Sequence, residues 1–123
     1  MASLPKARFG DRAQVIEAMK PGVTSGDVDN ACRGAVIEAG CGENYHYRTG
    51  YSIGLGYAPG RGEGHIMDLK PNDPQVIRAG MAFHLVPVLF IEEKVGIGFS
   101  ETALVTETGS EPLCEYPRKL IIV

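Results

Sequence analysis

Apolar residues in the first part of the chain recur at intervals of three and four, the spacing of one face of a helix. Over residues 7–19 this spacing is kept by Phe9, Ala13 and Ile16. Pro21 then disfavours helical backbone in the residue before it, and the glycine that follows suits a turn. The pattern predicts a first helix that ends before Pro21.

A second run of apolar residues at helical spacing predicts a helix over residues 27–39. Thr24 or Ser25 is placed to cap its first turn, and aspartates in that turn favour the positive end of the helix dipole. Gly40 comes directly after the run and suits the turn that ends a helix. Most of the apolar positions hold small residues, which favours close packing against a sheet.

After residue 40 the apolar pattern changes to short runs rich in β-formers, which are typical of strands. Four strands are expected, over residues 45–55, 81–91, 95–106 and 120–123. The first is interrupted at Gly50, and a glycine- and proline-rich loop is expected over residues 58–73. The second is nearly all apolar, which predicts a strand buried on both faces. Two helices followed by a run of strands predict an α+β fold.

Composition and charge narrow the class of protein. The 123 residues suit one domain, residues 1–123, and a net charge of −3 argues against a nucleic-acid partner, which requires a basic surface. The longest apolar run, residues 81–91, is too short to span a bilayer. The N-terminal segment lacks the apolar core of a signal peptide. Three scattered cysteines fit free thiols in a reducing compartment, so we expect a cytoplasmic protein with no membrane partner.

The segment from Gly50 to Gly64 is rich in glycine but does not match a phosphate-binding loop. No GxxxxGK occurs, and the glycines miss the GxGxxG spacing by one position. No helix is predicted after the segment to offer its N-terminus to a phosphate. From these residues alone, the segment is interpreted as a strand whose glycines let another backbone approach, followed by a turn.

Glu101 and His84 are ionisable residues that fall inside apolar strand sequence. Glu101 alternates with apolar residues, so it is either a functional carboxylate or a residue near a strand end that reaches solvent. His84 has no polar neighbour for three residues on either side. It is either a hydrogen-bonded core residue or a general base, since imidazole titrates near neutral pH.

The remaining ionisable candidates lie in polar or glycine-rich sequence. His46 and His65 are expected at the surface for this reason. Glu63 is either a solvated loop charge or a residue that points into a pocket. No HExxH, GxSxG or cysteine-nucleophile motif occurs, so spacing alone identifies neither a metal site nor a nucleophile.

Four segments together resemble the pita-bread superfamily, which includes methionine aminopeptidase, Xaa-Pro dipeptidase and creatinase. In chain order they are KPGVTSGDVD, RTGYSIGL, AGMAFHLVP and ETALVTETG. Within this superfamily the chain resembles ectoine hydrolase, a metal-independent creatinase-like member, in RTGYSIGL, GMAFH, TETGSEPL and the pattern of Tyr57, Pro59 and Glu63. The resemblance implies half of a pita-bread α+β fold, with two helices packed on a curved antiparallel sheet.

The resemblance also implies that the metal ligands of the superfamily are missing. In the metallopeptidases the glycine segment reads GHGIG, and its histidine ligand corresponds to Tyr51 in this chain. Two glutamate ligands correspond to Val86 and Ser100. These residues cannot replace imidazole and two carboxylates around a divalent ion, so neither a metal nor another cofactor is expected. Glu101, beside Ser100, faces the other side of the strand unless a bulge intervenes.

The activity implied by the resemblance is hydrolysis of a non-peptide C–N bond in a small zwitterion. Without a metal, activation of water requires a base that works near neutral pH. Glu101 and His84 are the residues expected to take part in binding or proton transfer. The residues expected to bind the substrate are Tyr51, Tyr57, Glu63 and Arg48. Among these, Glu63 would pair with a cationic amidine or guanidine.

The resemblance covers residues 9–123 and matches the second of two similar halves. The active site of the superfamily lies between the halves, and in creatinase-like enzymes a catalytic histidine comes from the first. A homodimer or a complementary half-domain is therefore expected. Pairing about a twofold axis would also cover the apolar strand 81–91. The alternative is a non-catalytic binding module or a truncated, inactive peptidase-like protein.

Overall fold

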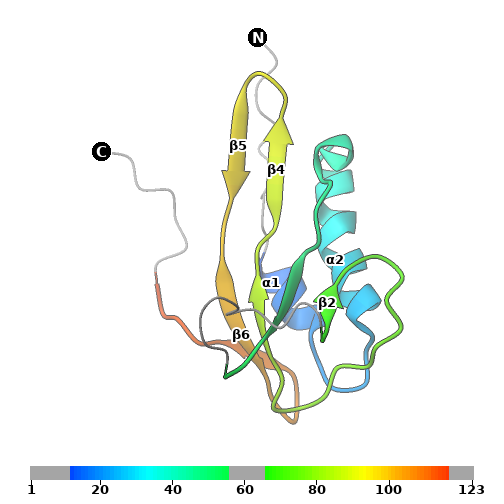
Figure 1. The fold of residues 1–123 in the computed structure, drawn as a ribbon, viewed down its shortest axis with the longest axis vertical. Coiled ribbons are helices and arrows are strands. Elements are labelled where there is room, and N and C mark those ends of the chain that lie inside the picture. Colours follow the sequence, from blue (N-terminus) through cyan, green and yellow to red (C-terminus); the bar gives the residue numbers. More distant parts are fainter. Residues whose placement is uncertain (1–11, 56–65, 117–123) are drawn as a thin grey trace.

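The chain passes from helices to strands, which confirms the predicted α+β class. The structure, a computed structural model, describes residues 12–55 and 66–116 (Figure 1). The helices are α1 (Arg12–Ala18), α2 (Ser25–Glu38) and a short 3-10 helix, η1 (Gly42–Asn44). The strands are β1 (Gly50–Ile53), β2 (Asp68–Leu69), β3 (Ala82–Leu85), β4 (Val88–Ile91), β5 (Val95–Gly98), β6 (Glu101–Val105) and β7 (Ser110–Pro112).

Helix α2 confirms the second predicted helix and its cap. Thr24 is the N-cap, and its hydroxyl accepts a hydrogen bond from the Asp27 backbone N–H at 3.1 Å. The Asp27 carboxylate in turn accepts from the Thr24 N–H at 3.0 Å. This capping box satisfies backbone donors that a helix N-terminus leaves free, so α2 begins at Ser25, two residues before the predicted start.

Helix α1 confirms the last part of the first predicted helix, and residues 7–11 lie outside the described part of the chain. Val15 is buried, and Ile16 packs against the core from a partly buried position. Met19, directly after the helix, is fully buried. Val15, Ile16 and Met19 therefore attach this helical segment to the core, and of these only Ile16 belongs to the predicted face of Phe9, Ala13 and Ile16.

The main sheet has five antiparallel strands and is covered by the helices on one face (Figure 1). Its strand order is β2-β1-β3-β6-β7. Burial alternates along β3 and β6, as expected for a sheet with one covered face. The covered face and the helical segments share one core, whose members include Val15, Met19, Val28, Cys32, Val36, Leu69, Phe83, Leu85, Ala103 and Val105.

Two strands predicted as single elements are each divided in two. Residues 81–91 form β3 and β4, separated at Val86 and Pro87, and residues 95–106 form β5 and β6. Proline has no N–H for a sheet ladder, so it marks the break. Strands β4 and β5 pair as a separate two-stranded sheet, which rises above the body of the molecule in Figure 1. The prediction that residues 81–91 are buried on both faces is wrong, because β3 and β4 bury only some of their residues.

Gly50 begins β1 and does not interrupt a longer strand. The predicted strand 45–55 is wrong over residues 45–49, which form no strand. A Cβ at Gly50 would collide with the His84 carbonyl oxygen and lie 3.2 Å from Leu69 Cδ1. Glycine therefore lets β1 pass between β2 and β3, which is the close backbone approach that the glycine-rich segment predicts.

Two short edge strands were not expected from the sequence. Strand β2 lies in the region 58–73, where only a loop is predicted, and β7 lies after the last residue of the predicted strand 95–106. The predicted strand 120–123 lies outside the described residues. Within residues 12–55 and 66–116, no helix is long and apolar enough to cross a membrane.

Candidate functional site

Four polar side chains form a continuous row across the open face of the main sheet. Tyr51 on β1 pairs with Asp68 on β2 and with His84 on β3, and His84 pairs with Thr102 on β6. Directly paired residues of antiparallel strands project to the same face. All four are partly buried and lie opposite the helix-covered core. We call these four residues the polar row.

Tyr51 and His84 are joined by a hydrogen bond at the centre of the polar row. The Tyr51 hydroxyl oxygen lies 2.9 Å from His84 Nδ1. The two rings meet edge to face, with centroids 5.3 Å apart and an interplanar angle of 73°. The bond uses Nδ1, so the protonation of the other ring nitrogen, Nε2, decides whether His84 offers a hydrogen-bond donor or an acceptor to a ligand.

Arg48 connects Asp68 to Tyr51 at the edge of the polar row. Its Nη1 donates to both carboxylate oxygens of Asp68, at 3.0 and 3.3 Å. The guanidinium carbon lies over the Tyr51 ring, 4.8 Å from the centroid. The Arg48 side chain is 45% exposed, so the ion pair contributes little to stability. Its clearer effect is to hold a cation against the tyrosine ring.

A buried polar network positions the chain just before β1. Asp29 on α2 accepts a hydrogen bond from Thr49 at 2.8 Å and two from Arg33 at 2.9 and 3.2 Å. Arg33 also donates to the carbonyl oxygens of Tyr45 and Tyr47. The Tyr45 hydroxyl lies 2.8 Å from the Thr49 hydroxyl oxygen. Side chains therefore hold much of the segment 45–49, which forms no strand.

Thr49 connects this network, through its backbone hydrogen bonds, to the segments on both sides of β1. Its backbone N–H donates to the Leu69 carbonyl, and its own carbonyl accepts from the Val86 N–H, both at 2.8 Å. Burial raises the pKa of the Tyr45 phenol, which keeps it protonated and able to donate. The sequence analysis missed this network, although Asp29 and Arg33 stand four residues apart on one predicted helix, a spacing that favours an ion pair.

The structure does not bring Glu101 and His84 together. Glu101 pairs with Leu85, one position before the pair of Thr102 with His84, and therefore projects to the opposite face. Its side chain lies on the helix-covered side and the residue is 4% exposed. This confirms that Glu101 sits among apolar core residues, but its role and that of His84 in binding or proton transfer stay predictions.

The other predicted site residues divide by location. Arg48 and Tyr51 lie at and beside the polar row, while Tyr57 and Glu63 lie outside the described residues, as does His65. His46 is exposed, as its polar sequence context predicts. The polar row was only partly foreseen, because Asp68 and Thr102 reach it through strand pairing between distant segments.

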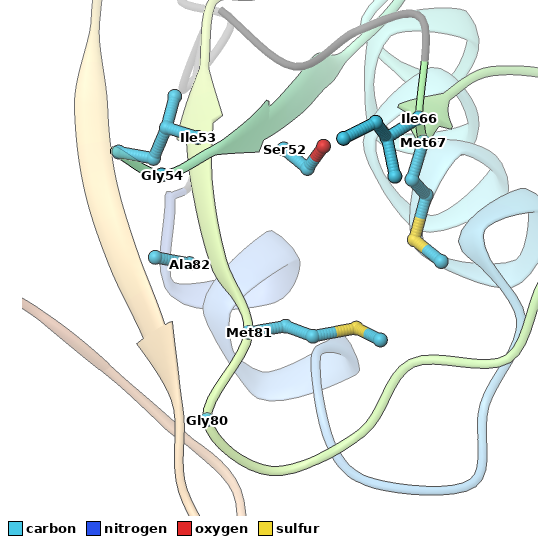
Figure 2. Close-up of a pocket in the computed structure, with 8 residues that line it drawn as sticks. All are labelled: Ser52, Ile53, Gly54, Ile66, Met67, Gly80, Met81 and Ala82. Carbon is cyan, nitrogen blue, oxygen red and sulfur yellow. The ribbon is translucent and has the colours of Figure 1, made fainter. Parts of the chain in front are cut away.

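A largely apolar cavity of about 460 Å³ opens at one end of the sheet (Figure 2). Its lining residues are Ser52, Ile53, Gly54, Ile66, Met67, Gly80, Met81 and Ala82. Figure 2 shows Met67 and Ile66 from one segment and Met81 from another projecting into one region. Ile53 and Ala82 share the face of the polar row, whereas Ser52 belongs to the helix-covered face, and none of the four residues of the polar row lines the cavity.

The sequence and the fold of this chain are similar to those of known proteins. A model of Metallopeptidase family M24 matches residues 11–107. The chain belongs to this family. It is 36% identical to ectoine hydrolase from Halomonas elongata over 107 residues, which are 87% of this chain and 26% of that protein. It is 30% identical to the Xaa-Pro dipeptidase of Pyrococcus horikoshii over 109 residues, 88% of this chain and 29% of that protein.

Solved structures of M24 relatives show the same architecture. The prolidase from Pyrococcus horikoshii matches with a TM-score of 0.78 and 27% identity, over 96% of this chain and 32% of that one. The Xaa-Pro dipeptidase from Bacillus anthracis matches with a TM-score of 0.79 and 26% identity, over 98% of this chain and 32% of that one. The fold is thus part of a pita-bread fold, and the chain spans about a quarter to a third of the length of these relatives.

The donors on the open face do not fit the divalent metal that the family name implies. At the three positions that the resemblance assigns to metal ligands, the Tyr51 hydroxyl is hydrogen-bonded to His84, the Val86 side chain has no ligand atom, and Ser100 offers a neutral hydroxyl. Over residues 12–55 and 66–116, no group of three or more histidine, cysteine, aspartate or glutamate side chains could hold a metal ion. The carboxylate in the polar row, that of Asp68, forms an ion pair with Arg48.

Proposed function

We propose that this M24-family chain is a metal-independent hydrolase of a non-peptide C–N bond in a small zwitterion. The observation that carries the proposal is the Tyr51–His84 hydrogen bond of 2.9 Å. It places an imidazole beside the residue that corresponds to a metal-ligating histidine in the metallopeptidases. Imidazole exchanges protons near neutral pH, which is the chemistry that a metal-free hydrolase requires. The 36% identity to ectoine hydrolase also supports a hydrolase function.

The proposed substrate is bound by its charges along the polar row. Arg48 presents a guanidinium beside Tyr51, which suits the carboxylate end of a zwitterion. Glu63 and Tyr57 remain the residues proposed for the cationic end. The apolar cavity at the end of the sheet suits the carbon skeleton of a compact ligand.

We further propose that the site is completed by a second copy of this chain or by a complementary half-domain. In this arrangement His84 contributes to binding or proton transfer, and the facing element supplies the base that activates water. The placement of Glu101 on the core face supports this division, because a base is needed on the open face and Glu101 projects away from it. The partner would exclude bulk water from the polar row.

The function is tested by assaying the purified chain against ectoine, creatine and a Xaa-Pro dipeptide. We expect turnover of a non-peptide substrate that is unchanged by a chelator and unchanged by added manganese, cobalt or zinc. His84→Gln should lower kcat at least about a hundredfold, the lower end of the range for general acid–base catalysis. The matched control, His46→Gln, changes an exposed histidine and should keep full activity. Dipeptide cleavage that appears only with added metal would contradict the proposal.

A non-catalytic binding module is the second candidate function. It is favoured by the separation of Glu101 from His84, which project to opposite faces of the sheet. Under this alternative, calorimetry would detect zwitterion binding that Tyr51→Phe and Arg48→Met weaken. No product would form, with or without metal.

A further inference from the structure

The hydrogen bond between Tyr51 and His84 can run in two directions, and each presents a different atom to a ligand. If the Tyr51 hydroxyl donates to Nδ1, the neutral imidazole carries its proton on Nε2 and offers a donor. If Nδ1–H donates to the hydroxyl oxygen, Nε2 carries a lone pair and offers an acceptor. The surroundings of Tyr51 decide between these states.

Arg48 is the neighbour that distinguishes the two directions. Its guanidinium carbon lies 4.8 Å from the centroid of the Tyr51 ring, over the ring face. A cation in this position attracts the electron density of the ring. The phenol oxygen is then a weaker acceptor, and its hydroxyl is a better donor.

Asp68 keeps the guanidinium in this place without contacting the imidazole. It accepts both hydrogen bonds of 3.0 and 3.3 Å from Arg48 Nη1. Asp68 pairs with Tyr51 on the side away from His84, so its negative charge is one strand further from the imidazole than Tyr51 is. The cation is therefore nearer to the tyrosine ring than a mobile surface arginine would be on average.

We propose that Arg48, acting through Tyr51, holds His84 in the tautomer protonated on Nε2, so that the polar row presents hydrogen-bond donors to a carboxylate or amide oxygen. Arg48 and Tyr51 are then positioning residues, and His84 is the residue that touches the ligand. Thr102, the cross-strand partner of His84, adds a hydroxyl on the same face. Ligands that offer only N–H donors, such as a guanidine, are disfavoured at this position.

This inference rests on the proposed hydrolase function and names the group that His84 recognises. In hydrolysis of an amidinium group, the oxygen of water adds to the carbon of the C=N bond, whose electron pair moves to nitrogen, and a base takes a proton from the added water. The C–N bond then breaks, the amine leaves with that proton, and the added oxygen becomes the carbonyl oxygen of the product. A donor at Nε2 would hydrogen-bond to this oxygen as the carbonyl forms, which assigns His84 to the oxygen atom and leaves the base to the facing element.

Long-range proton–nitrogen NMR on the full chain with isotope-labelled histidine tests the tautomer directly. The protonated and unprotonated ring nitrogens give well-separated signals, and His84→Gln identifies which pair belongs to His84. We expect the neutral ring to carry its proton on Nε2. Tyr51→Phe should bring the two nitrogen signals towards averaged positions, and Arg48→Met should produce a smaller shift in the same direction.

Arg78→Met is the matched control, because Arg78 is an exposed arginine before β3 that lies outside the polar row. It should leave the His84 signals unchanged, and backbone amide spectra show whether each variant is folded. A proton on Nδ1 in the unmodified protein would overturn the inference. So would a His84 spectrum that is the same in Tyr51→Phe. An effect of Tyr51→Phe without any effect of Arg48→Met would remove Arg48 from the proposal.

The ligand class is tested with acetate and methylguanidinium as separate probes at equal concentration. Acetate should shift the His84 Nε2 signal, and methylguanidinium should not. A shift from methylguanidinium alone, or from neither probe, contradicts the assignment of an oxygen ligand. None of these spectra depends on turnover, so failure of the tautomer assignment is distinguishable from failure of the hydrolase proposal.

Discussion

At the scale of single residues, the close approach of three strands depends on the absence of a side chain at Gly50. The backbone of β1 passes between β2 and β3 at this point, directly before Tyr51. The neighbouring atoms include the His84 carbonyl oxygen, which belongs to a central strand and cannot move independently. Gly50 therefore permits the close pairing of β1 with β3 that places Tyr51 opposite His84.

Gly50→Ala should destabilise the protein by about 1–3 kcal/mol, as overpacking of a well-packed interior does. The added methyl group would collide with the His84 carbonyl, so β1 must shift and the Tyr51–His84 bond should lengthen. Urea unfolding measures the stability. Gly109→Ala is the control, since a Cβ there meets no atom within 4 Å. Equal stability of the two variants would contradict the packing at Gly50.

At the scale of elements, helix α2 is fixed at both its start and its buried face. Its capping box joins Thr24 and Asp27, and its network through Asp29 reaches the segment before β1. The sequence offered Thr24 or Ser25 as the cap, and the structure selects Thr24, whose capping-box partner Asp27 is three residues away. The network was not visible in the sequence, because Thr49 and Asp29 are brought together only when the helix packs on the sheet. Local spacing determines the first contact, and tertiary packing determines the second.

The cap makes the stability of the protein depend on acid pH. Hydrogen bonds from the backbone and side chain of Thr24 lower the pKa of Asp27 below its ordinary value of 3.8. A carboxylate whose pKa is lower in the folded state adds stability above its unfolded pKa, and this is lost as the pH falls through the folded pKa. Urea unfolding at a series of pH values should therefore show a loss below about pH 4. Asp27→Asn should remove this component, whereas an unchanged pH profile in that variant would contradict it.

At the scale of the whole molecule, the β4–β5 hairpin stands apart from the main sheet and all four residues of β5 are exposed. Phe90 is 49% exposed and Ile97 is 41% exposed, on strands that pair with each other. Isolated two-stranded hairpins are marginal in water. The hairpin also continues β3 and β6, the two strands that carry His84 and Thr102. Covering it would therefore bring a partner close to the polar row.

We expect the chain to form a homodimer, with a mass in solution twice its 13.2 kDa. Light scattering on a sizing column measures this at tens of micromolar. Ile97→Lys places a charge on the exposed hairpin and should shift the population towards monomer. Ile37→Lys, at a 59% exposed position on α2, is the control and should leave the dimer intact. A monomeric unmodified chain would favour a complementary half-domain or a binding module instead.

The sequence by itself determined the α+β class, the two helices, the cap of α2 and the membership of Glu101 in an apolar face. These follow from spacings within single segments, where the 3.6- and 2-residue periods act. Only the tertiary structure decided that β3 leads into hairpin strand β4 and that hairpin strand β5 leads into β6. It also decided that Glu101 and His84 lie on opposite faces and that one row is formed by Asp68, Tyr51, His84 and Thr102. The physical reason is register: pairing between distant strands selects which residues meet, and a shift of one residue would send each side chain to the other face.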